Sequence, residues 1–482
     1  MSNNDNSYLR NFLEIPYDKL EILNLEAKKR RLKHLPESNY RNYYLEYLKK
    51  ETKLKAVIVG FCDLEGRFHM LDYDKKFFLS NFQNLTFDGS SIRGFSRLAE
   101  SDLRLKIDWP AFWWLPSDVF GAGKILIMSK ILAQDLKPYL LDTRTLLIAY
   151  LEQLKKQFGY TVNVANEVEG FLLSGQNVEK NYNEREGFKI ADQGGYYHSL
   201  PQDLLKIFID RTAEAQRAMA FENEKDHPEV APSQFELNYS YTEADIAADQ
   251  ILIYKLTARQ IAKSMGLTAT FLPKPIAGIN GSGMHTNLSI SKGGKNLFYS
   301  ESGKAKLSKL AWQFIEKVLH NTNDICLIMN SSVNSYRRLD PNFEAPNEIK
   351  VSKTDRGSMI RIPLFDQRSA RIEFRSVAPD ANPYLTIYSL IKTGLEGPMP
   401  KNQNRSKRTR VKFLPGNIQT AIQQFRQSKF TSTFLPSELK KNYLNLKQTV
   451  ANRSPVDLGT QVKNNEVIYH HEVYNQLLWN QF

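Results

Sequence analysis

The stretch Arg371-Ile372-Glu373-Phe374-Arg375 alternates charged with apolar side chains, and this alternation indicates the fold. Because successive side chains of a β-strand point to opposite faces, a strand here puts its charged residues on one face and Ile372 and Phe374 on the other. A sheet of such strands has one apolar face for helices to cover and one face suited to binding cations and anions together. Four other segments repeat the pattern, with these residues on their polar faces: Glu167 and Glu169; Gln234, Glu236 and Asn238; His285, Asn287 and Ser289; and Arg361.

Length and cysteine content restrict the class of protein. The 482 residues correspond to about three average domains, or to one large α+β domain with a smaller partner. The two cysteines, Cys62 and Cys326, lie far apart within apolar runs, so neither a disulfide framework nor a cysteine-based zinc site is indicated. The N-terminus does not read as a signal peptide, and no apolar run approaches the roughly 20 residues that span a bilayer. The sequence therefore predicts a cytoplasmic protein with no membrane partner.

The net charge of +13 invites a nucleic-acid interpretation, which the motifs do not support. Much of the excess lies in two clusters, residues 28–33 and residues 401–412. Neither cluster is accompanied by a helix-turn-helix, zinc-finger or RNP motif, and aromatic residues are sparse within them. Solvated basic segments are the favoured interpretation, so nucleic acid is not expected as a partner.

Three segments are expected along the chain. Residues 1–54 are charged and helix-like and form an N-terminal extension. Residues 55–138 form a small β-rich domain, in which a strand at residues 56–61 and a turn at 63–67 lead to a partner strand at 68–71. Residues 139–482 begin with an amphipathic helix over 146–158, preceded by Asp142. The larger part then alternates strands with helices at residues 201–220, 243–265 and 305–320, and is mainly helical from residue 417.

The candidate chemistry is carried by carboxylates and arginines. No P-loop and no glycine-rich dinucleotide-binding turn is present, so ATP would have to bind in another way. Three carboxylates could hold one divalent ion and two carboxylates with His285 another, which suits Mg²⁺ or Mn²⁺ and a two-metal clamp for phosphoryl transfer. The arginines, suited to carboxylate and phosphoryl oxygens, could instead form a structural ion-pair network with the same glutamates. They are Arg338, Arg356, Arg361, Arg371 and Arg375.

Several segments, in order from about residue 55 to the C-terminus, resemble the type I glutamine synthetase family. The matching segments are Phe87-Asp88-Gly89-Ser90-Ser91-Ile92 with Glu100-Ser101-Asp102; His227-Pro228-Glu229-Val230-Ala231-Pro232-Ser233-Gln234-Phe235-Glu236; Lys274-Pro275 through Gly281-Ser282-Gly283-Met284-His285; Asn334-Ser335-Tyr336-Arg337-Arg338-Leu339 through Glu344-Ala345-Pro346; Ile360-Arg361-Ile362-Pro363; Arg371-Ile372-Glu373; and Asn382-Pro383-Tyr384. The resemblance implies an α+β fold, with a small N-terminal β-grasp-like domain and a large C-terminal catalytic domain whose curved antiparallel sheet is covered by helices.

The resemblance also implies an activity and residue roles. ATP would phosphorylate the γ-carboxylate of glutamate, and ammonia would displace phosphate to give glutamine. Two or more Mg²⁺ or Mn²⁺ ions would bind per site. The first metal would be held by Glu169, Glu229 and Glu236, and the second by Glu167, His285 and Glu373. Glutamate would contact Arg338, Arg375, Asn280 and Gly281. ATP and the transferring phosphoryl group would contact Arg356, Arg361, Arg371, Tyr241 and Ser289.

The implied ammonium site spans two subunits. Ammonium would bind at Asp88, Ser91, Tyr196, Glu229 and Glu344. Asp88 would remove the proton, since only ammonia has a lone pair with which to attack, and Glu344 would close over the intermediate and exclude water. In this family the loop that bears the aspartate comes from the neighbouring subunit. A homo-oligomer, a dodecamer of two hexameric rings, is therefore expected.

The sequence departs from the family pattern at a few positions. Asn287 replaces a histidine next to the nucleotide, and Gly170 replaces a bulky aromatic residue. The tyrosine that some members carry as an adenylylation target, expected near residues 396–412, is absent. Arg97 matches a residue linked to glutamine feedback inhibition, with a plain surface arginine as the alternative.

Two other functions stay open from the sequence. One is a γ-glutamyl ligase that uses an organic amine or polyamine, which would need a more open ammonium pocket. The other is a catalytically silent relative with a structural or nucleic-acid-associated role through the basic segments. The complete set of metal-site and arginine positions favours the ammonia ligase.

Overall fold

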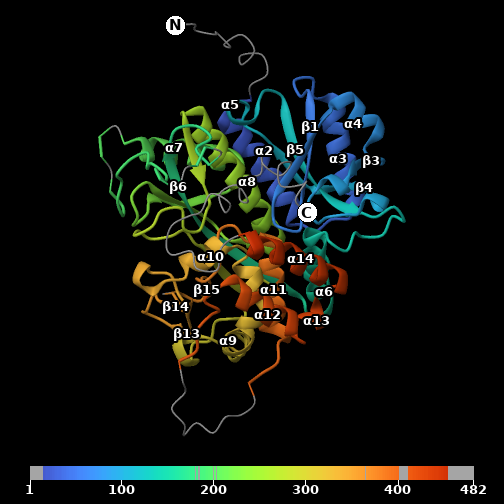
Figure 1. Ribbon diagram of the computed structural model, residues 1–482. Helices are drawn as coiled ribbons and strands as arrows, with labels where there is room; N and C mark the ends of the chain where they lie inside the picture. Colours follow the sequence, from blue (N-terminus) through green and yellow to red (C-terminus); the bar gives the residue numbers. More distant parts are fainter. Residues whose placement is uncertain are drawn as a thin grey trace.

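Two β-sheets and their covering helices build the molecule (Figure 1). The computed structural model describes residues 15–179, 181–182, 185–198, 200–201, 203–363, 365–400 and 411–453. Most of the basic segment 401–412 therefore lies outside the described residues. In the part of the chain that the structure describes, no helix has the length and apolar character needed to cross a membrane.

The first sheet has five strands in the order β2-β1-β5-β4-β3. β1 pairs antiparallel with β2, as the hairpin pattern of the sequence predicts, and parallel with β5. A short helix, α4 (Lys75–Asn81), follows β2. The strands are β1 (Ala56–Cys62), β2 (Phe68–Asp74), β3 (Leu85–Asp88), β4 (Asp102–Trp114) and β5 (Lys124–Leu132).

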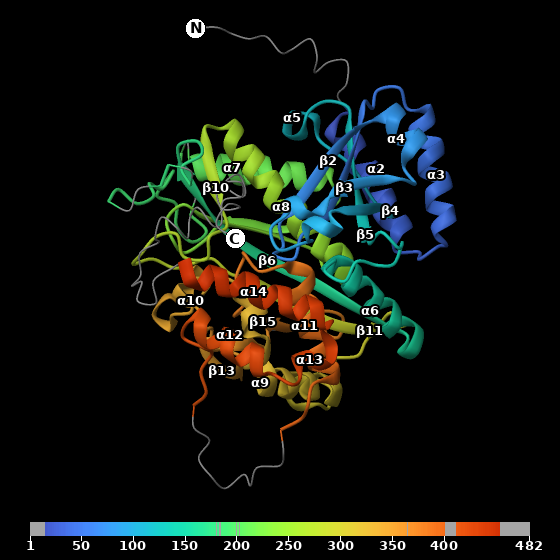
Figure 2. The same cartoon turned by 45° about the vertical axis from the view of Figure 1, so that its right-hand side comes forward.

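The second sheet has ten strands, seven of them in the order β13-β14-β15-β11-β6-β8-β7. Its neighbours pair antiparallel except β13 with β14, which run parallel. Figure 2 shows the long strand β6 crossing the middle of the molecule. The strands are β6 (Tyr160–Ser174), β7 (Asn223–Pro228), β8 (Gln234–Tyr239), β9 (Thr242–Glu243), β10 (Leu267–Thr270), β11 (Met284–Lys292), β12 (Lys295–Asn296), β13 (Glu348–Ser352), β14 (Ser358–Arg361) and β15 (Ile372–Phe374).

Several helices of the larger part begin where the sequence supplies a capping side chain. Asp142, Asp203 and Asn382 each accept hydrogen bonds from the first free backbone N–H groups of the helix that follows. The helices of the larger part are α6 (Thr143–Phe158), α7 (Leu204–Ala218), α8 (Ala244–Ser264), α9 (Lys309–Met329), α10 (Val333–Arg338), α11 (Pro383–Glu396), α12 (Ile418–Gln427), α13 (Thr431–Phe434) and α14 (Ser437–Arg453), with 3₁₀ turns at Lys304–Lys306 and Pro341–Phe343. Between the strands of the first sheet lie the short helix α5 (Ser117–Phe120) and 3₁₀ turns at Gly89–Ser91 and Leu98–Glu100.

Helix α9 differs from the helix expected at residues 305–320. Ala305 has a φ of 59°, which is left-handed and cannot continue into a helix, and the Ser308 side chain caps the helix by accepting from the N–H of Ala311. At the other end the helix continues to Met329, because Ile325 and Ile328 keep the helical spacing of the buried face.

Two N-terminal helices, α2 (Tyr17–Arg31) and α3 (Glu37–Lys50), pack onto strand β4. From α2, Asn24 donates to the carbonyl of Trp114 at 2.9 Å and to that of Ala218 at 2.8 Å. Trp114 belongs to the first sheet and Ala218 to α7 beside the second. Helix α2 therefore connects the two halves of the molecule.

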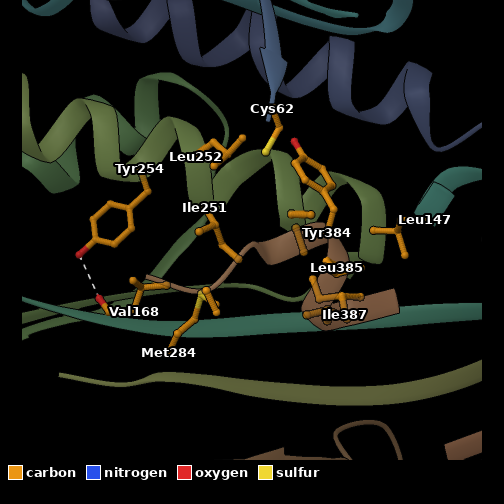
Figure 3. Packing of buried hydrophobic residues seen from close by; sticks show 14 of the residues in the cluster. Cys62, Leu147, Val168, Ile251, Leu252, Tyr254, Met284, Tyr384, Leu385 and Ile387 are labelled. Carbon is orange, nitrogen blue, oxygen red and sulfur yellow. Dashed lines mark hydrogen bonds between the residues drawn. The ribbon is translucent and has the colours of Figure 1, made fainter. Parts of the chain in front are cut away.

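A continuous apolar core joins the two sheets. Figure 3 shows Cys62, at the end of β1, next to Tyr384 of α11, with Ile251 and Leu252 of α8 nearby. The hydroxyl of Tyr254 donates to the carbonyl of Val168 in β6 at 3.2 Å. The apolar faces of the strands thus pack against helices, and their polar faces are available to form the site.

Candidate active site

Strand register gathers the carboxylates of the second sheet. His285 pairs with Glu167 across β11 and β6, and Asn287 pairs with Glu373 across β11 and β15. On the other side of β6, Glu169 pairs with Glu236 of β8. Paired residues lie about 5 Å apart on the same face, so these side chains share one surface.

Glu167, His285 and Glu373 form one candidate metal group, with one ligand atom of each within 4.8 Å of the others. His285 Nδ1 lies 3.3 Å from Glu167 Oε2 and 3.9 Å from Glu373 Oε1. Burial opposes the charge of Glu167, yet the contacts with His285 and Asn287 lower its pKa to about 2. This carboxylate is therefore ionised and ready to accept a cation.

The second candidate metal group consists of His227, Glu229 and Glu236, again within 4.8 Å of one another. Burial and the neighbouring Glu169 and Glu236 raise the pKa of Glu229 to about 9. The sequence assigned no role to His227, although it stands two residues before Glu229 in the matching segment. Its Nε2 is buried and makes no hydrogen bond among the described residues.

Glu169, expected with Glu229 and Glu236, lies between the two groups. Its Oε2 accepts from the N–H of Gly283 at 2.7 Å, and its Oε1 is 3.8 Å from His285 Nε2. A Cβ at Gly283 would lie 2.5 Å from Arg338 Nη2 and 2.8 Å from His285 Nε2, so glycine leaves room for these two side chains. The six predicted metal ligands thus form one continuous cluster, with His227 at its edge.

The arginines surround this cluster. Glu373 accepts from Arg361 Nη1 at 2.6 Å and from Arg375 Nη1 at 2.7 Å, as the ion-pair alternative anticipates. Arg338 donates to the carbonyls of Arg375 and Val377, and burial lowers the pKa of Arg338 to about 10. Arg371 Nε donates to Asn287 Oδ1 at 3.0 Å. Two of the guanidiniums therefore hold Glu373 in place within the cluster.

Two cavities meet at this cluster. A cavity of about 240 Å³ is lined by His227, Glu229 and Glu236 of one metal group, by Glu167 and His285 of the other, and by Tyr196, Asn280, Gly281, Glu344 and the five arginines. A larger one of about 1040 Å³ is lined by Ser289, Tyr241, Asn287 and a glycine turn at Gly293. Glu167, Lys225 and Arg371 line both cavities. A ligand in the large cavity can thus present its charged end to the carboxylates and arginines of the small one.

Two loops border the small cavity. Asn280 Nδ2 donates to Glu344 Oε2 at 3.1 Å, and both residues line the cavity. Tyr196 and Tyr197 stack with ring centroids 3.8 Å apart and share a hydrogen bond of 2.7 Å between their hydroxyls. The sequence named Tyr196 but not Tyr197, which follows it directly. A consecutive aromatic pair was the signal that could have indicated it.

Asp88 and Ser91 lie elsewhere. They stand at the end of β3 in the first sheet, are exposed, and do not line either cavity. The Ser90 and Ser91 side chains donate to the Asp88 carboxylate and lower its pKa. Arg97 is likewise exposed, between β3 and β4. Within the described part of this chain, these residues and the carboxylate cluster are not brought together.

Gly170 is explained by packing. A Cβ at this position would lie 2.6 Å from the ring of Phe235 on the neighbouring strand β8. The ring of Phe235 therefore leaves no room for a side chain at this position.

The fold and site together define a two-domain α+β enzyme with its candidate active site on the polar face of the larger sheet. Residues 53–134 match the family "Glutamine synthetase, beta-Grasp domain", and residues 140–454 match "Glutamine synthetase, catalytic domain". The chain belongs to the glutamine synthetase family, as the sequence motifs predict.

Relatives and solved structures agree with this family. A glutamine synthetase of Methanosarcina mazei is 34% identical over 415 residues, covering 83% of this chain and 91% of the relative. One of Staphylococcus epidermidis is 35% identical over 382 residues, covering 75% and 83%. The Plasmodium falciparum glutamine synthetase structure has a TM-score of 0.75 at 22% identity, covering 85% of this chain and 95% of that one, and a GmaS/ADP complex scores 0.73 with the same identity and coverage. These structures confirm the predicted fold class.

Proposed function

We propose that this chain ligates ammonia to the γ-carboxylate of L-glutamate, with ATP converted to ADP and phosphate and γ-glutamyl phosphate as the intermediate. Membership of the glutamine synthetase family supports the activity. The observation that carries the assignment to this site is the junction of the two cavities at Glu167 and Arg371. The large cavity has the volume of a nucleotide site, and the small one has the charges that glutamate and a phosphoryl group require.

The donor set fits divalent metal ions. Each candidate group offers two carboxylates and one imidazole, which Mn²⁺ accepts readily and Mg²⁺ accepts with water in the remaining positions. The buried Nε2 of His227, which makes no hydrogen bond among the described residues and lies 3.6 Å from Glu236 Oε1, is a further atom suited to a ligand role. When bound, two such ions would neutralise phosphate charge and align the reacting oxygens. The proposed ligands are Glu167, Glu169, Glu229, Glu236, His285 and Glu373, with His227 beside them as a further ligand.

The arginines bind and orient the substrates in this proposal. Arg338 and Arg375, with Asn280 and the backbone at Gly281, hold the glutamate carboxylates. Phosphoryl oxygens are contacted by Arg356, Arg361 and Arg371, which stabilise the charge that develops during transfer. Tyr241 and Ser289 lie along the large cavity and contact the rest of the nucleotide.

Ammonia activation depends on a second subunit. Tyr196, Glu229 and Glu344 line the small cavity, but Asp88 and Ser91 do not. We therefore propose a homo-oligomer, a dodecamer of two six-membered rings, in which Asp88 of one subunit enters the cavity of its neighbour. There the carboxylate takes a proton from ammonium, and Glu344 keeps water from the acyl phosphate. The cytoplasmic location stays a prediction from the sequence.

The decisive experiment measures phosphate release from ATP with glutamate and Mg²⁺ or Mn²⁺, on protein whose oligomeric state is checked by light scattering. The second substrate is ammonium in one series and a panel of organic amines and polyamines in another. Turnover that requires glutamate and ammonium supports the proposal. Turnover with an organic amine alone would assign a γ-glutamyl-amine ligase instead, and no turnover by an intact oligomer would leave the silent relative.

A further inference from the structure

Lys274 is a fully buried lysine at the start of the loop that leads to Gly283. Its backbone is fixed to α10, because its N–H donates to Asn334 Oδ1 at 2.6 Å and its carbonyl accepts from Asn334 Nδ2 at 3.0 Å. The lysine is outside both candidate metal groups and lines neither cavity. Burying a charged group costs free energy, and substrate contact does not account for the burial of Lys274.

The ammonium group has two contacts that come from different loops. It donates to the carbonyl of Ile279, and it lies 3.8 Å from the centroid of the Phe343 ring. A desolvated ammonium over an aromatic face is held by the ring's electrostatic field, and this attraction requires the positive charge. Burial lowers the pKa of Lys274 to about 8, with Asp340 opposing and Arg338 reinforcing the shift, so the group is mainly charged at neutral pH.

Both contacted residues directly precede site residues. Ile279 precedes Asn280 and Gly281, and Phe343 precedes Glu344. Glu344 has a φ of 58°, in the left-handed region that a non-glycine residue adopts only when its surroundings hold it there. Apart from the lysine, the two loops are joined by the hydrogen bond from Asn280 to Glu344.

We propose that Lys274 is a positioning residue that ties the Asn280 loop to the Glu344 segment (residues 340–346) and so keeps Glu344 over the acyl phosphate. This inference rests on the proposed function and adds a residue to it. If the segment opens, water attacks the acyl carbon of γ-glutamyl phosphate, the bond from carbon to the phosphate oxygen breaks, and glutamate and phosphate leave. The net result is ATP hydrolysis without glutamine.

The test compares Lys274→Met, Phe343→Leu and the double variant with the wild type. The measured quantity is phosphate released per glutamine formed at limiting ammonium, together with the KM values of glutamate and ATP. We expect a ratio near one for the wild type, and a severalfold higher ratio for each single variant, with the KM of glutamate raised more than that of ATP. The ratio for the double variant should be no higher than for the single variants, because each substitution removes the same contact between Lys274 and Phe343.

Two controls separate this role from general stability. Lys440 is also buried, donates to the carbonyl of Ser428 and lies 5.4 Å from the Phe425 ring, so Lys440→Met removes a similar lysine far from the site. It should leave the ratio unchanged. Phe343→Tyr keeps an aromatic face and should remain coupled.

The outcomes are distinct. If the wild type makes no glutamine, the proposed function fails. If it makes glutamine while Lys274→Met and Phe343→Leu stay as coupled as the wild type, only the role of Lys274 is overturned. If Lys274→Met does not fold, the Phe343→Leu variant alone tests the role of Lys274. The Phe343 side chain is only partly buried, so this substitution should not prevent folding.

Discussion

Asn287 donates from Nδ2 to Glu167 Oε1 at 3.0 Å, across the neighbouring strands β11 and β6. Its Oδ1 accepts from Arg371 Nε at the same time. One fixed amide therefore joins a proposed metal ligand to a proposed phosphate ligand. The family resemblance places a histidine at this position, so this chain has a different connection between the two cavities.

Replacing Asn287 with Leu should impair ATP binding more than glutamate binding. The variant keeps the size of the side chain but removes both hydrogen bonds, each of which involves a charged group and contributes about 1.5–3 kcal/mol. We expect the KM of ATP to rise about tenfold or more, while that of glutamate changes little, together with weaker Mn²⁺ binding by calorimetry. An unchanged KM for ATP would rule out this role.

Replacing Glu373 with Gln should abolish most phosphoryl transfer. The change preserves shape but removes the charge that pairs with Arg361 and Arg375 and that would bind the proposed metal ion. Losing a charged group at such a site lowers kcat by about 10²–10³. The rate of the first turnover of ADP formation, with metal affinity measured separately, checks this. Normal ADP formation would remove Glu373 from the second metal group.

Mixing two inactive variants tests whether the site is shared between subunits. Asp88→Ala should bind ATP and glutamate but form no glutamine, and Glu373→Gln should fail in phosphoryl transfer. In oligomers assembled from equal amounts of both, about a quarter of the sites would combine an intact Asp88 with an intact neighbouring Glu373. Glutamine synthesis by the mixture, but not by either variant alone, is expected. An inactive mixture would place Asp88 and Glu373 of the same chain in one site.

Replacing Arg31 with Met should strongly destabilise the fold. Arg31 of α2 donates to Asp245 and to the fully buried Asp249, which also accepts from Arg144 and Tyr384. Removing one partner of a buried ion pair costs about 3–5 kcal/mol. Arg217→Met is the control, because its ion pairs are partly exposed and should cost about 1 kcal/mol or less. Chemical denaturation of the two variants measures the difference, and equal losses would contradict the prediction.

The same variant has a defined pH dependence. Burial opposes the charge of Asp249, but Arg144 and Arg31 overcome this and lower its pKa in the folded protein. A lowered folded pKa contributes stability above the unfolded value of about 3.9, and that stability is lost as the pH falls through the folded pKa. The stability gap between wild type and Arg31→Met should therefore be full near neutral pH and shrink below about pH 4. A gap that is constant across this range would show that Arg31 acts by packing alone.

Some features could be predicted from the sequence because they depend on local order. Alternation with a period of two is a property of each strand alone, so it correctly placed Glu167, Glu373 and His285 on one polar face. The same holds for the helix that begins after Asp142, whose side chain caps it. The family motifs added the fold class, since they occur in a fixed order along the chain.

Other features depended on which distant segments meet. His227 lies with Glu229 and Glu236 in one candidate metal group, and Glu169 lies close to His285. These distances are set by the register between strands, which the sequence of a single strand does not determine. The sequence assigned no role to Lys274, yet its backbone is bonded to Asn334 of α10 and its ammonium group lies over the Phe343 ring. The sequence predicts that the N-terminal segment is an extension. In the structure, Asn24 instead bonds to Trp114 of β4 and Ala218 of α7, and Arg31 bonds to the buried Asp249 of α8. The sequence by itself thus determined which residues face the site and what they can bind, while tertiary packing decided which of them lie within bonding distance.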